Sequence, residues 1–218
     1  MGEKENIISL YRKRAKNYDL VANLYNLIGL NEYAYRVKAV KELNLKKGDT
    51  VIELACGTGL NFISLQKRVG KSGKIIGIDV TDAMLEQAKE RIKKNKWKNV
   101  VLVKSDIADY KFPKNIDGVI STYAITLSPE FDKVIKRGYQ ALLPGGRMVI
   151  LDFKMPNNWL TIFVPFLIWT TKPFGIRKEL AVRHPWESIK KYFPTYALTE
   201  LYGGIVYISR GIKGEKVK

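Results

Sequence analysis

The sequence predicts an α/β protein, a parallel sheet with helices on both faces that closes with an antiparallel hairpin. Two observations predict it. Short apolar runs alternate with helical stretches from about residue 50 onward, which is typical of parallel strands linked by crossover helices. The last two strand-like runs are instead joined by Gly203-Gly204, a hairpin signal. With 218 residues, the chain can bury the core of one domain.

The N-terminal part is expected to be helical up to about Lys47. Apolar and aromatic residues recur there at helical spacing in two stripes. Lys47-Gly48-Asp49 is expected to end the helix, with the glycine as its stop. The two stripes are Leu20, Leu24, Leu27 and Ile28, and Tyr33, Val37, Val40 and Leu43.

The alternating part contains five apolar runs that we expect to be buried strands, with three helices between them. The strands are expected at 50–53, 74–78, 100–103, 118–121 and 147–151. The helices are expected at 60–69, 82–95 and 130–142. The hairpin strands are expected at 196–201 and 205–209.

The chain is strongly basic, with a formal net charge of +17. This charge predicts attraction to a polyanion, either nucleic acid or an anionic membrane surface. Lysine enrichment of the kind that accompanies thermophily is the other explanation. The single cysteine excludes an internal disulfide and a cysteine-based zinc cluster, and we predict no metal. The first residues lack the apolar core of a signal peptide, so an intracellular location is expected.

A glycine-rich turn follows the first strand, in the stretch VIELACGTGL. Gly57 and Gly59 match the first two glycines of a dinucleotide-binding turn, but the third position is Phe62. A bulky ring there argues against a bound pyrophosphate, and no Gly-Lys-Ser/Thr follows as in a P-loop. The glycines still indicate close approach of the backbone to a ligand, or positive φ angles.

Two acids at strand ends indicate which ligand the turn binds. Asp79 ends the second strand, where a carboxylate can accept hydrogen bonds from both ribose hydroxyls of an adenosine. Asp106 ends the third strand and can accept from an adenine amino group, with the Ile107 backbone reading the ring edge. The sequence therefore predicts an adenosine site without phosphate at the carboxyl edge of the sheet.

The chain resembles class I S-adenosylmethionine-dependent methyltransferases over about 11–210. Their successive motifs match the glycine turn, the strand ends at Asp79 and Asp106, and the stretch Leu143-Pro144-Gly145-Gly146-Arg147. The resemblance implies a Rossmann-like seven-stranded sheet with an antiparallel seventh strand. It also implies S-adenosyl-L-methionine as cofactor and S-adenosyl-L-homocysteine as product. The cofactor contacts that it implies are Tyr11, Glu53, Ala55, Cys56, Gly57, Thr58, Gly59, Asp79, Val80, Met84, Ser105, Asp106, Ile107 and Ser121.

The Tyr18-Asp19 pair resembles an N-terminal element of ubiquinone/menaquinone C-methyltransferases and bacterial phosphatidylethanolamine N-methyltransferases. In those enzymes this region packs over the cofactor as a lid. The segments 183–188 and 200–204 look like the same subgroup. The resemblance therefore implies a lid or membrane-facing segment at 1–47. It implies a methyltransferase domain at 48–218 with a substrate-side insertion at 154–195.

The segment 158–172 bears on the substrate. Its apolar run is broken by Pro165 and is too short to span a bilayer of about 30 Å. Trp159 and Trp169, with Lys154 and Lys172 outside them, suit a segment lying in the membrane interface. A buried helix covering the pocket is the other interpretation. Both predict an apolar substrate cavity.

Tyrosines are candidates for contacting a methylated amine, because their rings bind methylammonium groups. The candidates at the reacting end are Tyr18, Tyr123 and Tyr11. His184, the only histidine, is a candidate general base; a structural role before Pro185 is the alternative.

We therefore expect a cytoplasmic methyltransferase, peripheral to the inner face of the membrane, that N-methylates a phospholipid amine headgroup. The alternatives are C-methylation of a quinol and methylation of RNA or a soluble small molecule, with nucleic acid the less favoured partner. A silent cofactor-binding scaffold is the non-enzymatic alternative, and the intact Asp79 and Asp106 argue against it. The sequence leaves the oligomeric state open.

Overall fold

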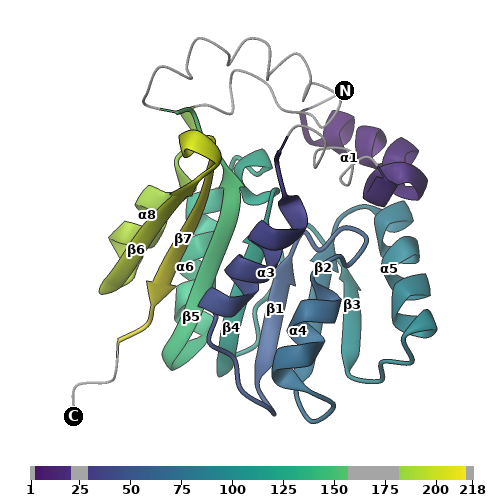
Figure 1. Cartoon of the computed structure of the whole chain (residues 1–218), viewed down its shortest axis with the longest axis horizontal. Coiled ribbons are helices and arrows are strands. Elements are labelled where there is room, and N and C mark those ends of the chain that lie inside the picture. Colours follow the sequence, from purple (N-terminus) through teal and green to yellow (C-terminus); the bar gives the residue numbers. More distant parts are fainter. Residues whose placement is uncertain (1–2, 21–28, 157–181, 215–218) are drawn as a thin grey trace.

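The structure, a computed structural model, describes residues 3–20, 29–156 and 182–214. Within these ranges seven strands form one sheet in the order β3-β2-β1-β4-β5-β7-β6 (Figure 1). β1 to β5 are parallel, whereas β7 runs antiparallel to both β5 and β6. The strands are β1 (Thr50–Leu54), β2 (Lys74–Asp79), β3 (Val100–Lys104), β4 (Ile116–Thr122), β5 (Leu142–Phe153), β6 (Thr195–Leu201) and β7 (Val206–Ile212). The predicted mixed sheet with its terminal antiparallel hairpin is confirmed.

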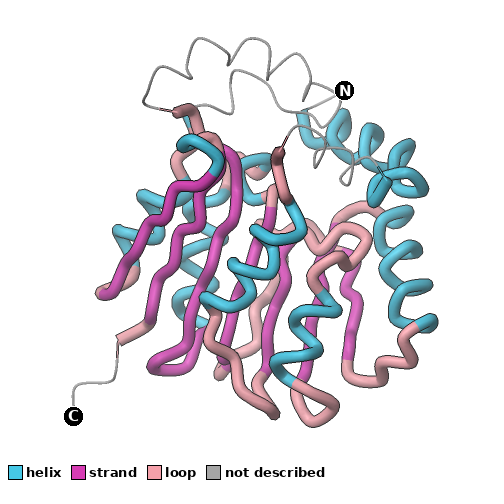
Figure 2. The backbone as a smooth tube through the Cα atoms, viewed as in Figure 1, coloured by secondary structure: helices cyan, strands magenta, loops and turns pink. Residues whose placement is uncertain are grey.

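Helices cover both faces of the sheet. Because successive side chains of a strand point to opposite faces, Val51 packs into one buried cluster and Ile52 into the other. The first cluster includes side chains of α3 (Glu32–Glu42), α4 (Phe62–Val69) and α5 (Asp82–Lys94). The second includes side chains of α6 (Phe131–Ala141) and α8 (Pro185–Tyr192). The helices and strands can be followed by colour in Figure 2.

Most of the predicted elements occur within two residues of their expected ends, but β5 begins at Leu142 and not at Arg147. The additional length comes from pairing, because Leu142 lies opposite Ile116 through a register shift. Backbone hydrogen bonds also join Gly145 and Gly146 to Lys213, at the end of β7. The expected hairpin is present, and the short 3₁₀ helix η7 (Tyr202–Gly204) forms its turn.

The N-terminal expectation is wrong about where the helix ends. α3 ends at Glu42, where Asn44 adopts a positive φ of 53°, so the predicted glycine stop at Gly48 comes too late. In the stripe at 33–43, Tyr33 is 58 % exposed and Val37 is 38 % exposed, whereas Val40 and Leu43 are buried. In the other stripe, Leu20 is also exposed. The remaining members, Leu24, Leu27 and Ile28, lie outside the described residues.

Two features of the fold position the site. The order of the sheet reverses between β1 and β4, and ligands of open α/β sheets bind in the crevice that such a reversal leaves at the carboxyl ends. α1 (Glu3–Arg14) lies at this same edge, near the start of α5 (Figure 1). Within the described ranges, no helix is both long and apolar enough to cross a membrane.

Candidate active site

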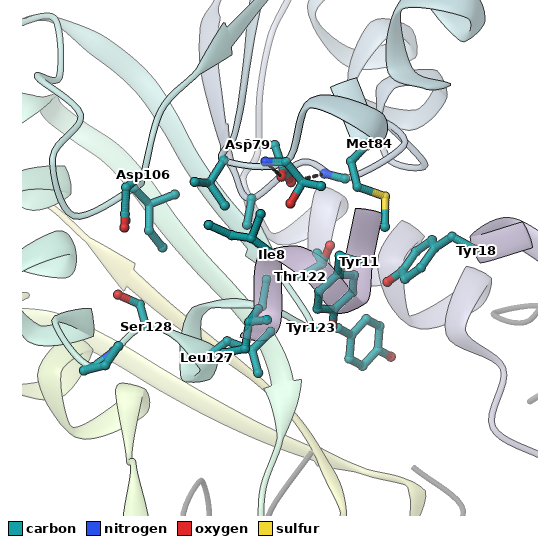
Figure 3. Close-up of a pocket in the computed structure, with 18 of the residues that line it drawn as sticks. Ile8, Tyr11, Tyr18, Asp79, Met84, Asp106, Thr122, Tyr123, Leu127 and Ser128 are labelled. Atoms are coloured by element: carbon teal, nitrogen blue, oxygen red, sulfur yellow. Dashed lines mark hydrogen bonds between the residues drawn. The ribbon is translucent and has the colours of Figure 1, made fainter. Parts of the chain in front are cut away.

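A cavity of about 320 Å³ opens at the carboxyl edge of the sheet (Figure 3). Side chains from α1, from the ends of β1, β2 and β4, and from the loops that follow the strands form its wall. They are Ile7, Ile8, Tyr11, Tyr18, Ala55, Gly57, Asp79, Val80, Thr81, Met84, Asp106, Ile107, Thr122, Tyr123, Ala124, Leu127, Ser128, Pro129 and Glu130. Ten of the predicted site residues are among them.

The two glycines of the turn serve different purposes. Gly57 lines the cavity with φ 55°, and a Cβ atom there would meet open space. Gly59 has φ 77°, and a Cβ atom there would lie 2.5 Å from the ring of Phe62. The bulky residue that replaces the third glycine therefore packs directly against the turn, and Gly59 accommodates this ring. Gly59 does not line the cavity.

Asp79 and Asp106 both line the cavity, at the ends of neighbouring strands. Asp79 accepts hydrogen bonds from the backbone N–H groups of Gly57 and Thr81, each at 2.8 Å. Burial raises the pKa of Asp79, and the hydrogen bonds from Thr81 and Gly57 lower it. Asp106 accepts from the backbone N–H of Ala108 at 2.8 Å. The two carboxylates are thus held in fixed orientations by the backbone.

Six predicted cofactor contacts do not line the described cavity: Glu53, Cys56, Thr58, Gly59, Ser105 and Ser121. Ser121 is fully buried and faces away, because Thr122, its neighbour in β4, takes the cavity side. Burial raises the pKa of the Cys56 thiol well above its ordinary value, so this side chain stays protonated and a poor nucleophile. The Ser105 hydroxyl donates to the Asp106 carbonyl.

Glu53 lies behind the glycine turn in a buried polar network. Its Oε1 atom accepts from the Asn61 side-chain amide at 2.7 Å, and the same amide nitrogen donates to the Thr122 hydroxyl at 2.9 Å. No hydrogen-bond donor in the described ranges reaches the buried Oε2 atom. Burial raises the pKa of Glu53 to about 7, against the lowering effects of Asn61 and Arg36.

α1 forms one wall of the cavity through Ile7, Ile8 and Tyr11. The Arg12 guanidinium joins this helix to the start of α5, because it donates to both carboxylate oxygens of Asp82 at 2.9 and 3.0 Å. One face of the helix therefore contacts the cavity, and ion pairing holds its C-terminal end.

The chain after α1 is tied to the glycine turn. Asp19 accepts from the Thr58 hydroxyl at 2.6 Å and pairs with Arg91 of α5. Arg91 also donates to the Thr58 carbonyl at 2.8 Å. Thr58, one of the predicted cofactor contacts, therefore connects the N-terminal segment to the turn.

The tyrosine candidates line the cavity, and Tyr18 and Tyr123 both lie close to Arg36. The Arg36 guanidinium sits over the Tyr123 ring, 4.9 Å from its centroid. Tyr123 has an unusual positive φ of 56°, a strained conformation for a bulky residue. Burial raises the pKa of Tyr11, Tyr18 and Tyr123, so these hydroxyls are protonated at neutral pH and unsuited to act as bases.

His184, the predicted general base, does not line the described cavity. It precedes α8, where its ring stacks on Trp186 with centroids 4.6 Å apart. Its Nδ1 atom lies 3.3 Å from a carboxylate oxygen of Glu187. This placement favours the structural interpretation of His184.

A short turn, η3 (Ile125–Leu127), forms the far wall of the cavity with the residues around it. Asp152 of β5 holds the turn in place, because its carboxylate accepts from the backbone N–H and the hydroxyl of Thr126. Burial raises the pKa of Asp152 to about 6. From the other side, Arg183 donates to the carbonyls of Thr126 and Leu127.

The sequence analysis missed nine lining residues: Ile7, Ile8, Thr81, Thr122, Ala124, Leu127, Ser128, Pro129 and Glu130. For Thr122 a signal existed, since strand alternation allows only one of Ser121 and Thr122 to face the cavity. For Ile7 and Ile8 the one signal was the lid that the resemblance implies at 1–47, because nothing in the local pattern specifies which strand ends α1 crosses. In the described ranges, no three histidine, cysteine or acidic side chains are grouped to hold a metal ion.

The cavity fits an adenosine-containing cofactor. Its two strand-end carboxylates are spaced over β2 and β3, as a ribose and an adenine attached to it would require. Gly57 leaves open space where a side chain would otherwise project. The volume also lies in the range of small-molecule sites. Asp79 would hold the ribose, and Asp106 with Ile107 the adenine.

Comparisons with known proteins agree with this geometry. A family model described as a methyltransferase domain matches residues 45–193. A demethylmenaquinone methyltransferase of Lactobacillus johnsonii is 30 % identical over 196 residues, which are 89 % of this chain and 71 % of that protein. The Staphylococcus carnosus enzyme of the same name is 31 % identical over 158 residues, 72 % of this chain and 64 % of that one.

Solved structures share the fold. A SAM-dependent methyltransferase from Aquifex aeolicus has a TM-score of 0.63 at 24 % identity, over 81 % of this chain and 88 % of that one. Phosphoethanolamine N-methyltransferase 2 of Haemonchus contortus, in complex with S-adenosyl-L-methionine, has a TM-score of 0.67 at 17 % identity. That alignment covers 84 % of this chain and 53 % of the other.

Proposed function

The chain belongs to the methyltransferase-domain family and is an S-adenosylmethionine-dependent methyltransferase, and from this premise we propose that it C-methylates the ring of a reduced, apolar quinone. Both relatives described above are demethylmenaquinone methyltransferases. The observation that carries the proposal is the composition of the cavity wall beyond the adenosine contacts. Tyr11, Tyr123, Ile8 and Leu127 supply aromatic and aliphatic surface there, which suits a flat, uncharged ring.

The transfer balances without any oxidant or reductant. S-adenosyl-L-methionine, when bound, supplies a methyl group on a sulfonium sulfur, which keeps the electron pair of the broken carbon–sulfur bond. A carbon of the electron-rich hydroquinone ring provides the pair for the new carbon–carbon bond and then loses its proton. The protein mainly aligns the two reactants. Glu130, a cavity-lining carboxylate that is exposed to solvent and accepts from Lys133 at 2.6 Å, would pass the ring proton to water.

The composition of the wall favours a quinol over a phospholipid amine, the acceptor first expected from the sequence. A phosphoethanolamine headgroup would bring a phosphate next to the reacting nitrogen. The lining residues that the structure describes include no lysine, arginine or histidine side chain to pair with that phosphate, and burying an unpaired charge is costly. A neutral ring meets no such cost.

A quinone with a long apolar tail requires access from a membrane, and we propose that the protein is peripheral to one. Tyr33, Val37, Leu20 and Val182 are exposed large hydrophobic residues of the described chain. They belong to the N-terminal helical region or precede α8. With a net charge of +17, such a surface suits anionic lipid.

Methyl-labelled S-adenosyl-L-methionine tests the acceptor directly. The purified protein is incubated with anionic vesicles that contain either a reduced polyprenyl naphthoquinone lacking the ring methyl group or phosphatidylethanolamine, and separately with total RNA. We expect label in the quinone alone. Label in phosphatidylethanolamine or RNA, with none in the quinone, would refute the proposal. Vesicle sedimentation at low and high salt tests the membrane contact, because electrostatic docking weakens as salt rises.

Asp79→Asn tests the proposed cofactor contact separately from the acceptor. The amide keeps the shape but loses the charge that accepts from the N–H groups of Gly57 and Thr81. Because hydrogen bonds to charged groups contribute about 1.5–3 kcal/mol, we expect at least a roughly tenfold weaker affinity for S-adenosyl-L-homocysteine by calorimetry. An unchanged affinity would contradict the ribose assignment.

A further inference from the structure

The order of the strands places the parts of the cofactor along the edge of the sheet. The adenine contact Asp106 follows β3, the ribose contact Asp79 ends β2, and the glycine turn follows β1. β4 is the next strand in the sheet and ends at Thr122. A cofactor that begins at β3 with its adenine must therefore bring its amino-acid end to β1 and β4. That end carries a carboxylate.

Thr122 offers a hydrogen-bond donor at this place. Its hydroxyl oxygen accepts from Arg36 at 2.5 Å and from Asn61 at 2.9 Å. A hydroxyl group has two lone pairs and one proton, so both accepting positions are used and only donation remains. No acceptor in the described ranges takes this proton. Because Thr122 lines the cavity, the proton is available to a ligand.

The orientation of the Asn61 amide follows from its other partner. The amide nitrogen donates to the Glu53 carboxyl at 2.7 Å, and the same nitrogen faces Thr122. When Glu53 is ionised, an amide turned around would place its oxygen against an accepting oxygen of Glu53. Ionised Glu53 therefore keeps the donor side of Asn61 toward Thr122, so the hydroxyl proton does not point toward Asn61.

Arg36 completes the arrangement from α3. It is 7 % exposed and lies 3.6 Å from a carboxylate oxygen of Glu32, one helical turn earlier. The guanidinium places a positive charge behind the Thr122 hydroxyl, which polarises its O–H bond toward the cavity. It also attracts any negative charge that the hydroxyl contacts.

We propose that the Thr122 hydroxyl is a directed hydrogen-bond donor to the carboxylate of the cofactor's amino-acid end, and that Arg36 and Asn61 are the positioning residues that make it one. The proposal concerns the cofactor alone and does not depend on which acceptor is methylated. Its failure and the failure of the quinol assignment are therefore seen in different experiments.

The test compares two ligands by titration calorimetry. S-adenosyl-L-homocysteine carries the carboxylate, whereas 5′-methylthioadenosine has the adenosine and the sulfur but lacks the amino-acid end. Thr122→Val removes the donor at nearly constant volume. We expect it to weaken the binding of S-adenosyl-L-homocysteine roughly tenfold or more and to leave 5′-methylthioadenosine binding unchanged. Thr122→Ser should restore the binding of S-adenosyl-L-homocysteine.

The ratio of the two affinities distinguishes loss of the Thr122 contact from a general loosening of the cavity. A general loosening would weaken both ligands, because both bind the adenosine site. Equal losses for both ligands, or no loss for S-adenosyl-L-homocysteine, would overturn the proposal. Arg36→Lys should lower this ratio too, since a lysine cannot hold both Thr122 and Glu32 with a planar fork. Arg210→Lys is the matched control, because Arg210 binds Glu42 at the far end of α3, and it should leave the ratio unchanged.

Discussion

Glu53→Gln should change how the stability of the protein depends on pH. Glu53 is 1 % exposed, and burial raises its pKa from 4.5 to about 7. Between these two pH values the folded protein keeps a proton that the unfolded chain has released. The free energy of unfolding therefore falls as pH rises through this window. The stabilising contribution is complete below pH 4.5 and lost above about pH 7.

The size of the effect follows from the pKa difference. At about 1.4 kcal/mol for each pH unit, the rise of the Glu53 pKa corresponds to about 3 kcal/mol. Glutamine is neutral at every pH and keeps the oxygen that accepts from Asn61. Relative to the wild type, the variant should therefore gain about 3 kcal/mol between about pH 4 and about pH 8. Asp152, which also has a raised pKa, is present in both proteins and cancels.

Urea unfolding followed by tryptophan fluorescence, without cofactor, measures this difference across the pH range. Glu86→Gln is the matched control, because the Glu86 side chain is 67 % exposed and its replacement removes a carboxylate outside the buried network. If the Glu53→Gln and wild-type curves run parallel, Glu53 ionises normally despite its burial. That result would refute the reasoning.

Two further predictions concern the glycine turn and α1. Gly59→Ala should destabilise the fold by about 3 kcal/mol, since the new Cβ atom would clash with Phe62 at a positive φ. Gly57→Ala should cost only about 1 kcal/mol, from backbone strain; equal losses in urea unfolding would contradict this contrast. Arg12→Ala removes the hydrogen bonds to Asp82 and should weaken cofactor affinity about two- to fivefold. High salt should abolish that difference, and an effect that salt leaves intact would count against an ionic latch.

The strands and the two strand-end acids of the cavity were predictable because their signals are contiguous. Each buried strand is a short apolar run, and Asp79 and Asp106 follow such runs directly. Parallel strands place their carboxyl ends at one edge, so the two acids meet without knowledge of the loops between them. The helical spacing of apolar residues in the N-terminal part is weaker evidence of burial, since Tyr33 and Val37 proved exposed.

The sequence by itself determined the sheet, its hairpin and the methyl donor, because periodicity, turn glycines and strand-end acids are local features. Only the tertiary structure showed what surrounds the Thr122 hydroxyl. Its partners Asn61 and Arg36 lie 61 and 86 residues away in the chain, and no local pattern pairs them. The raised pKa of Glu53 likewise comes from burial and from neighbours on other elements. Such properties arise from packing, which brings together groups that the sequence keeps far apart.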